Sequence, residues 1–265
     1  MPTLDGTVYD ISGPADAPAV ALIHGLGLTR RTWDGLLPAL ASRYRVLTYD
    51  LFGHGESTEP PETPSLALYA EQLRALMDGL GLQTCALAGF SLGGMINRRF
   101  AIDHKHRTAA LVILNSPHER GAEAQRLVEE RAAASQAGGP GATLDATIER
   151  WFTPGFRAAR PDVIAAIRAL VLANDPRSYG QCRQVLAAGV VELIRPEPPI
   201  AVPALVMTCE NDSGSTPAMT HAIAGEIAGA QAIVVPGLQH MGLVEEPALF
   251  AEPMLAFLDE VLASQ

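Results

Sequence analysis

The sequence has few cysteines and no long apolar run, and each shortage excludes a class of protein. Its 265 residues include three cysteines, at the distant positions Cys85, Cys182 and Cys209. An odd number without paired spacing predicts reduced thiols in a cytoplasmic protein, with no disulfide framework and no metal site. No apolar run reaches the roughly 18 residues that a membrane span needs. The first ten residues, MPTLDGTVYD, lack the basic start and apolar stretch of a secretory signal.

Positive charge is also scarce. The chain carries 19 Lys and Arg residues against 29 Asp and Glu, which gives a formal net charge of -10. An acidic surface repels phosphate backbones, so nucleic acid is excluded as a partner. The basic residues form no long run, which argues against a polybasic membrane anchor. With 48% hydrophobic and 18% charged residues, the composition is that of a globular protein.

Short apolar runs alternate with longer helical patterns along most of the chain. This alternation predicts an α/β fold, with a mostly parallel sheet and helices on both of its faces. The predicted buried strands are Ala19–Ile23, Arg45–Tyr49, Cys85–Ala88, Ala110–Leu114, Ala204–Thr208 and Ala232–Val235. An alternating segment, Thr7–Ile11, is expected to form an edge hairpin with the first of these runs. The predicted helices are Thr32–Ala41, Ser65–Gly81, Leu92–Ala101, Ala218–Ile227 and Pro247–Val261.

One long region interrupts the alternation. From His118 to Ile200 the sequence shows no strand pattern, only helical stretches separated by the turn signals AGGPGA, TPG and NDP. A helical insertion between two strands is expected to lie as a cap over the carboxyl edge of the sheet, where ligands bind in such folds. The sequence therefore predicts a core domain of residues 1–117 and 201–265 and a helical cap of residues 118–200.

The strongest chemical signal is the pentapeptide Gly89-Phe90-Ser91-Leu92-Gly93. The bare G-x-S-x-G pattern is modest evidence, and a plain Gly/Ser turn would also match it. Its context is stronger, because the pattern follows a predicted strand and opens a predicted helix, as a nucleophile elbow requires. The flanking glycines would let neighbouring backbones approach a strained turn. We interpret Ser91 as the nucleophile.

A serine hydroxyl needs a base, and the chain offers seven histidines. His240 lies between the last predicted strand and the last predicted helix, in a loop at the carboxyl edge of the sheet. We interpret it as the general base, with a surface-loop histidine as the alternative. His24 and His54 each precede a glycine and are interpreted as loop-shaping residues. The remaining histidines are expected at the surface: His104, His106, His118 and His221.

A third group must orient the imidazole and stabilise its positive charge. Asp212 follows the predicted strand Ala204–Thr208, and the order Ser, Asp, His along the chain favours it. Glu210, two residues earlier, is the main rival, and Asp50 is another. An Asx turn before the following helix would also explain an aspartate at position 212.

An oxyanion needs donors where negative charge develops. The backbone N–H of Leu92, directly after the nucleophile, is one candidate. The second is the N–H of Leu26, in the loop His24-Gly25-Leu26-Gly27 that follows the first strand. The glycines of this loop would let it turn back toward Ser91.

With these residues placed, the chain resembles the α/β-hydrolase superfamily over nearly its whole length. The motifs that carry the resemblance are HGLG at 24–27, YDLFGHGES at 49–57, GFSLGG at 89–94, CENDSGSTP at 209–217 and GLQHMGLVEEP at 237–247. Within the superfamily it is most similar to the 3-oxoadipate enol-lactonase group, through GFSLGGMI, LVILNSP, NDPRSYGQCRQVLAAG and HMGLVEEPALF. This resemblance implies an α/β-hydrolase fold and a small carbonyl substrate, an ester or lactone, held under a helical cap.

Two further residues are candidates for the substrate pocket. Arg98 lies seven residues past Ser91 and therefore on the same helical face, where it could bind an acidic substrate or form a structural ion pair. Trp151, in the predicted cap, could line the pocket or pack the cap onto the sheet.

The sequence thus predicts a serine hydrolase that cleaves a small ester or lactone through an acyl-enzyme, with no metal or organic cofactor. The same triad would also serve a C–C bond or amide hydrolase. From another class of protein, a ligand-binding or signalling receptor on a hydrolase fold stays an alternative. The expected partner is a small-molecule substrate, and self-association into a homo-oligomer stays open.

Overall fold

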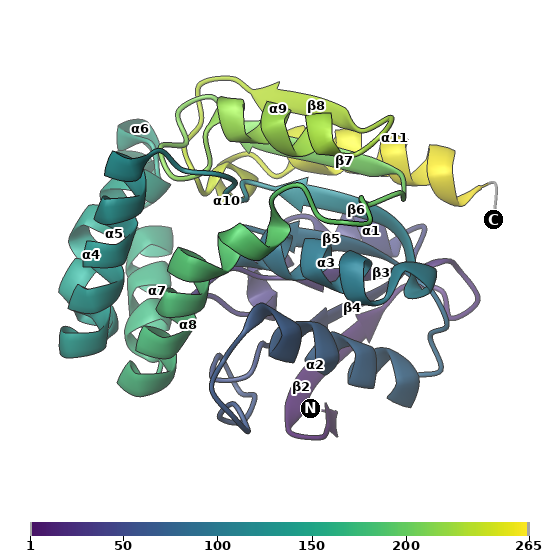
Figure 1. The fold of residues 1–265 in the computed structure, drawn as a ribbon, viewed down its shortest axis with the longest axis horizontal. Coiled ribbons are helices and arrows are strands. Elements are labelled where there is room, and N and C mark those ends of the chain that lie inside the picture. Colours follow the sequence, from purple (N-terminus) through teal and green to yellow (C-terminus); the bar gives the residue numbers. More distant parts are fainter. Residues whose placement is uncertain (1, 264–265) are drawn as a thin grey trace.

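A single sheet of eight strands organises the chain in the computed structural model, which describes residues 2–263 (Figure 1). The strand order is β1-β2-β4-β3-β5-β6-β7-β8, antiparallel for the pairs β1–β2 and β2–β4 and parallel from β4 onward. The strands are β1 (Thr3–Leu4), β2 (Thr7–Ser12), β3 (Ala19–Ile23), β4 (Arg45–Tyr49), β5 (Cys85–Phe90), β6 (Thr108–Leu114), β7 (Ala204–Cys209) and β8 (Gln231–Val235).

The central strands carry the core. All six residues of β5 and all six of β7 are buried, as expected for parallel strands covered on both faces. The six apolar runs of the sequence all form strands. The edge-hairpin prediction is wrong, because Thr7–Ser12 pairs with β4 and with the two-residue strand β1, and not with β3. Hydrophobic periodicity identifies a strand but does not specify its neighbour.

Helices cover both faces of the sheet. Figure 1 shows α2 (Leu66–Gly79), α3 (Leu92–Asp103) and α9 (Pro217–Glu226) on one face, with α1 (Leu37–Ala41) and α11 (Ala248–Leu262) on the other. The predicted helix over Thr32–Ala41 is instead split into a 3-10 turn, Arg30–Trp33, and the short α1. Gly35 and Pro38 explain the break, because neither supports a helix interior.

Between β6 and β7 the described chain forms helices and no strand. The α-helices are α4 (Ala122–Gly138), α5 (Leu144–Trp151), α6 (Pro154–Ala159), α7 (Pro161–Leu172) and α8 (Pro176–Ala188). They gather beside one end of the sheet in Figure 1. Helix α6 was not predicted, because Thr153-Pro154-Gly155 reads as a turn. In the structure Thr153 caps this helix by accepting a hydrogen bond from the Phe156 N–H, and Pro154 starts it.

Two features are absent from residues 2–263. No helix in this part of the chain is long and apolar enough to cross a membrane. The same residues contain no group of three or more His, Cys, Asp or Glu side chains arranged to hold a metal ion.

Candidate active site

Ser91 lies in a strained turn between β5 and α3. Its φ of 56° and ψ of −112° are unusual for a residue with a side chain. The turn is held by a hydrogen bond from the Ser91 N–H to the Leu114 carbonyl oxygen, 2.8 Å away. Its neighbours must be glycine, since a Cβ on Gly89 would lie 2.1 Å from the Gly93 oxygen and one on Gly93 would lie 2.1 Å from the Ile23 oxygen. These contacts hold the strained turn, which places Ser91 directly after the end of β5.

His240 reaches Ser91 from the loop between β8 and α10 (Gly242–Glu245). Its Nε2 lies 3.1 Å from the Ser91 Oγ, and its Nδ1 lies 2.6 Å from Oδ2 of Asp212. Because a carboxylate only accepts hydrogen bonds, Nδ1 must carry the proton. Nε2 is then free to accept the proton of the serine hydroxyl.

Asp212 is almost completely buried at the end of β7. Oδ1 accepts hydrogen bonds from the N–H groups of Gly214 and Ser215, and Oδ2 accepts from Asn115 as well as from His240. Burial alone would raise the pKa of this carboxyl, but the charge of His240 and these hydrogen bonds outweigh it and lower the pKa. Asp212 is therefore held as an anion beside the imidazole.

The two rivals of Asp212 have other partners. Glu210 is exposed and accepts a hydrogen bond from the Gly237 N–H, 2.9 Å away. Asp50 is buried and accepts hydrogen bonds from the backbone N–H and the guanidinium of Arg30. Neither carboxylate contacts His240, so among the three candidates the structure joins Asp212 to the imidazole.

Asn115 is a site residue that the sequence reasoning missed. It follows β6 with a left-handed φ of 47°, and its side-chain amide donates to Oδ2 of Asp212 at 2.9 Å. Its backbone N–H donates to the Met207 carbonyl oxygen of β7. The phrase LVILNSP contains this residue, but nothing in its spacing indicates a contact with an aspartate 97 positions later.

The predicted oxyanion donors lie beside Ser91. Leu92 is the first residue of α3, and Leu26 lines the same pocket as Ser91. The loop that carries Leu26 is close to Ser91, since a Cβ on Gly25 would lie 3.3 Å from the Ser91 Cβ. Within residues 2–263, neither leucine N–H donates to another backbone group outside regular elements. Their role as oxyanion donors stays a prediction.

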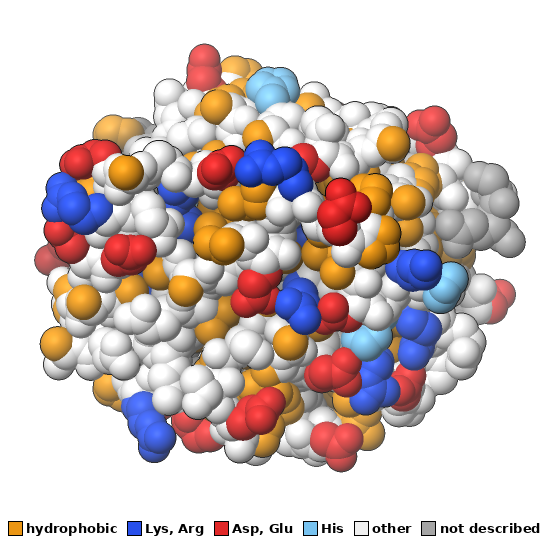
Figure 2. All heavy atoms as spheres, viewed as in Figure 1, with side chains coloured by type: hydrophobic (Ala, Val, Ile, Leu, Met, Phe, Trp, Pro, Cys, Tyr) orange, Lys and Arg blue, Asp and Glu red, His pale blue; other side chains and the backbone are white. Residues whose placement is uncertain are grey.

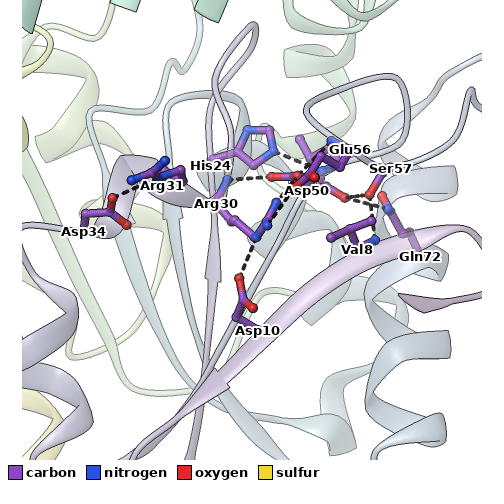
Figure 3. Close-up of polar contacts among 11 residues, drawn as sticks. Val8, Asp10, His24, Arg30, Arg31, Asp34, Asp50, Glu56, Ser57 and Gln72 are labelled. Carbon is purple, nitrogen blue, oxygen red and sulfur yellow. Dashed lines mark hydrogen bonds and ion pairs between the residues drawn. The ribbon is translucent and has the colours of Figure 1, made fainter. Parts of the chain in front are cut away.

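A buried polar network holds the Leu26 loop in place (Figure 3). His24 Nδ1 donates to the Gly25 carbonyl oxygen at 2.7 Å, and its Nε2 accepts from the Leu51 N–H at 3.0 Å. Arg30, at the other end of the loop, donates its backbone N–H and its Nη1 to Asp50. His24 and His54 are both buried, consistent with loop-shaping roles.

The helical segment contacts the His240 loop directly. The Met241 N–H donates to the Trp151 carbonyl oxygen at 2.8 Å. Thr153 donates its N–H and its hydroxyl to the carboxylate of Glu245, at 2.8 and 2.6 Å. The ring of Trp151 lies 6.1 Å from the imidazole of His240, centroid to centroid. The end of α5 is thus fixed to the residues that follow the imidazole.

A pocket opens over Ser91 and encloses about 670 Å³, its mouth included. One part of its wall is apolar, formed by Leu26, Leu28, Phe90, Val128, Trp151 and Leu186. The predicted pocket residue Trp151 is therefore present. Four arginines, none of them singled out in the sequence, also line it: Arg120, Arg131, Arg150 and Arg183.

Two expectations need correction. Arg98 does not line this pocket. It is buried, and its guanidinium donates to the carbonyl oxygens of Gly94 and Pro117 and to the Ser116 hydroxyl, instead of forming an ion pair. Helical spacing places it on the same face as Ser91, but that face packs against the loop after β6. His118, expected at the surface, is also buried, with Nε2 3.0 Å from Glu226.

A mostly parallel sheet with a strained serine turn after β5 and a histidine loop after β8 defines a class, the α/β hydrolases. The family model described as the alpha/beta hydrolase family matches residues 20–252. The chain belongs to this family, and the predicted fold class is confirmed.

Known proteins narrow the resemblance further. The chain is 27% identical to 3-oxoadipate enol-lactonase 2 of Acinetobacter baylyi, over 91% of this chain and 89% of that protein. It is 27% identical to a candidate carbamate hydrolase, RutD, of Variovorax paradoxus, over 96% of this chain and 97% of that protein. A crystal structure of the enol-lactonase from Burkholderia xenovorans LB400 superposes with a TM-score of 0.88 at 30% identity, covering 95% of this chain and 96% of that one. The predicted similarity to the enol-lactonase group is confirmed.

Proposed function

We propose that this protein is a serine hydrolase that cleaves an ester or lactone of a small carbonyl substrate. The observation that carries the proposal is the hydrogen-bonded chain from Ser91 through His240 to Asp212 at the base of a pocket. A serine, a base and an orienting acid in this geometry are the parts of an activated nucleophile. The enol-lactonase relatives support a lactone or ester as the substrate class.

The mechanism is a two-step acyl transfer. Ser91 Oγ attacks the carbonyl carbon while His240 Nε2 takes the hydroxyl proton, and the N–H groups of Leu26 and Leu92 stabilise the oxyanion. His240 returns the proton to the leaving alkoxide, which leaves an acyl ester on Ser91. Water, deprotonated by the same imidazole, then releases the acid. Asp212 stays ionised throughout and stabilises the imidazolium.

We further propose that residues 118–200 act as a cap on a core formed by residues 1–117 and 201–265. The pocket wall supports this division, because Trp151 and the four arginines come from the helical segment, whereas Ser91 and His240 come from the sheet and its loops. In this arrangement the core supplies the chemistry and part of the pocket wall, and the cap supplies the rest of the wall, including all four arginines.

Hydrolysis of an amide-type bond is the second candidate, favoured by the similarity to candidate carbamate hydrolases. The same residues would act, with His240 protonating a leaving amine in place of an alkoxide. The two candidates differ in the bond that is cleaved. Matched pairs of ester and amide with the same acyl group, compared by kcat/KM, would separate them.

The first test is p-nitrophenyl acetate hydrolysis by the wild-type protein and by Ser91→Ala. We expect the variant to lose roughly 10³-fold or more of kcat. Ser42→Ala, at an exposed serine, is the matched control. Equal activity of Ser91→Ala and wild type would refute the assignment of the nucleophile. If no ester, lactone or amide is turned over but small ligands bind, the protein is better described as a receptor on a hydrolase fold.

A further inference from the structure

The four pocket arginines come from four separate parts of the helical segment. Arg120 precedes α4, Arg131 lies on α4, Arg150 on α5 and Arg183 on α8. The pocket lining contains no aspartate or glutamate. The chain as a whole has an excess of acidic residues, and Figure 2 shows Lys and Arg side chains interspersed with Asp and Glu side chains on one outer face. The wall of the pocket is therefore positive in an acidic protein.

Three of these arginines repel one another. The charges of Arg131 and Arg183 act on Arg150, and the charge of Arg131 acts on Arg183. Burial, followed by this repulsion, lowers the pKa of Arg150 to about 10, and burial lowers the pKa of Arg120 to about 10. With a pKa of about 10, Arg120 and Arg150 still carry a full charge near neutral pH. Like charges gathered in a partly buried wall destabilise the fold unless an anion compensates them.

The protein itself provides little compensation. Among residues 2–263 no carboxylate lies within ion-pair distance of Arg120, Arg131, Arg150 or Arg183. Arg120 donates to the carbonyl oxygens of Leu186 and Ala187 and to Gln125, and Arg183 donates to Thr143 and lies over the Tyr179 ring. These neutral contacts use only part of the five N–H donors of each guanidinium.

Arg131 and Arg150 are the least satisfied of the four. Arg131 makes no hydrogen bond or ion pair within the described chain. Arg150 makes one long contact, 3.4 Å to Thr147, and its buried Nε has no partner. A Cβ on Gly214, in the loop of Asp212, would lie 3.8 Å from the Arg150 Nη1, so this guanidinium is next to the triad. Asp212 cannot serve it fully, because four other donors already surround that carboxylate.

We propose that the substrate of this site carries at least two negative charges, held by Arg120, Arg131, Arg150 and Arg183 while Ser91 attacks its carbonyl group. The inference rests on the proposed hydrolase function and specifies its substrate class. Carboxylates and phosphate both match the planar, multi-donor guanidinium group. One carboxylate accepts at most a few of the available N–H donors, whereas two anionic groups can engage several guanidinium groups at once.

The first test measures kcat/KM for p-nitrophenyl esters that differ in charge. The acyl groups are butyrate, with no free carboxylate, succinate with one, and tricarballylate with two. Because hydrogen bonds between charged groups are stronger than neutral ones, we expect kcat/KM to rise about tenfold or more with each added carboxylate. Equal values across the series, or a fall with added charge, would overturn the proposal.

Arg131→Gln is the decisive variant. Because Arg131 has no polar partner within the described chain, and because its removal relieves repulsion, the thermal midpoint should stay constant or rise. The ratio of kcat/KM for the tricarballylate ester to that for the butyrate ester should fall about tenfold. Arg177→Gln, at an exposed arginine on α8, is the matched control and should keep the ratio. An unchanged ratio in Arg131→Gln would contradict the assignment.

A binding experiment separates this inference from the proposed function. Ser91→Ala is titrated calorimetrically with tricarballylate, glutarate, butyrate and pyrophosphate. We expect the multiply charged ligands to bind at least tenfold more tightly than butyrate. Comparison of the affinities of the carboxylates with that of pyrophosphate identifies the preferred anion. Tight binding without hydrolysis of any ester would leave the inference standing and refute the proposed function. Hydrolysis of esters without any preference for added negative charge would leave the proposed function standing and refute the inference.

Discussion

The N–H of Met241 donates to the carbonyl oxygen of Trp151 across 2.8 Å, and this bond joins the residue after the imidazole to the end of α5. A second connection lies close by, where Thr153 donates twice to Glu245. The orientation of His240 therefore depends on the helical segment as well as on Asp212. Hydrogen bonds thus connect the helical segment to the loop of His240 at this point.

Glu245→Gln should weaken this link. The glutamine side chain carries no charge, and its oxygen can still accept one hydrogen bond from Thr153. Its NH2 group is a donor, so it cannot accept the second hydrogen bond that Thr153 donates. We expect unfolding to become easier by about 1–3 kcal/mol, together with a fall in kcat of several-fold for any ester that is turned over. Thermal unfolding and steady-state kinetics measure both effects. Glu246→Gln, at the exposed neighbouring position, is the control. Equal behaviour of the two variants would argue against the link.

Asn115 should act as a positioning residue for the triad. Asn115→Gly removes the amide that bonds Asp212 while it tolerates the left-handed φ of 47°. Since this bond helps to lower the pKa of Asp212, the acid limb of the pH–rate profile should shift to higher pH, and kcat should fall about tenfold or more.

Asn115→Ala separates strain from hydrogen bonding. It loses the same bond and adds strain at a left-handed position, so it should be less stable than Asn115→Gly. The pH–rate profiles of the two variants should nevertheless shift alike. If neither profile moves, Asn115 has only a structural role.

Gly89→Ala should abolish the elbow. The added Cβ would lie 2.1 Å from the backbone oxygen of Gly93, and the backbone on either side cannot yield without moving Ser91. We expect either no folded protein or a folded protein whose activity is reduced to that of Ser91→Ala. Gly225→Ala, at a helical glycine of α9 with open space around it, is the control and should gain about 0.5–1 kcal/mol of stability. Full activity of Gly89→Ala would exclude the strained turn as a requirement.

Two buried histidines should make the protein sensitive to acid. Burial lowers the pKa of His24 to about 4 and that of His54 to about 3. Both stay neutral in the folded protein at pH 5, whereas the unfolded chain, with a histidine pKa of about 6.5, takes up protons. The unfolded state thus binds more protons, and the free energy of unfolding falls as the pH drops below about 6.5.

Between pH 7.5 and pH 5 the expected loss is about 2 kcal/mol for each of these histidines. Urea unfolding at the two pH values measures it. In His24→Asn the difference between the two pH values should shrink by about 2 kcal/mol, whatever the stability of the variant at pH 7.5. The matched control is His106→Asn, at an exposed position. A variant that keeps the whole pH-dependent loss would show that His24 does not cause it.

Most of the sheet could be predicted from local pattern. A strand buried on both faces needs a continuous apolar run, and a nucleophile elbow needs small residues around its serine, so both leave a signature in a few consecutive residues. Ser91, Asp212 and His240 each follow a predicted strand, and the carboxyl ends of parallel strands meet at one edge. Their convergence follows from the fold class, once that class is known.

The tertiary structure decided what depends on distant contacts. The pairing of β2 with β4, the burial of Arg98 away from the pocket and the hydrogen bond of Asn115 to Asp212 have no local signature. The same holds for the four arginines, which come from separate elements and meet only because the helices pack together. Sequence periodicity determined the strands of the scaffold, and a local motif determined the turn that carries Ser91, because these depend on neighbouring residues. The packing of the helical segment decided the charge of the pocket, because charge at a site depends on which side chains share a space.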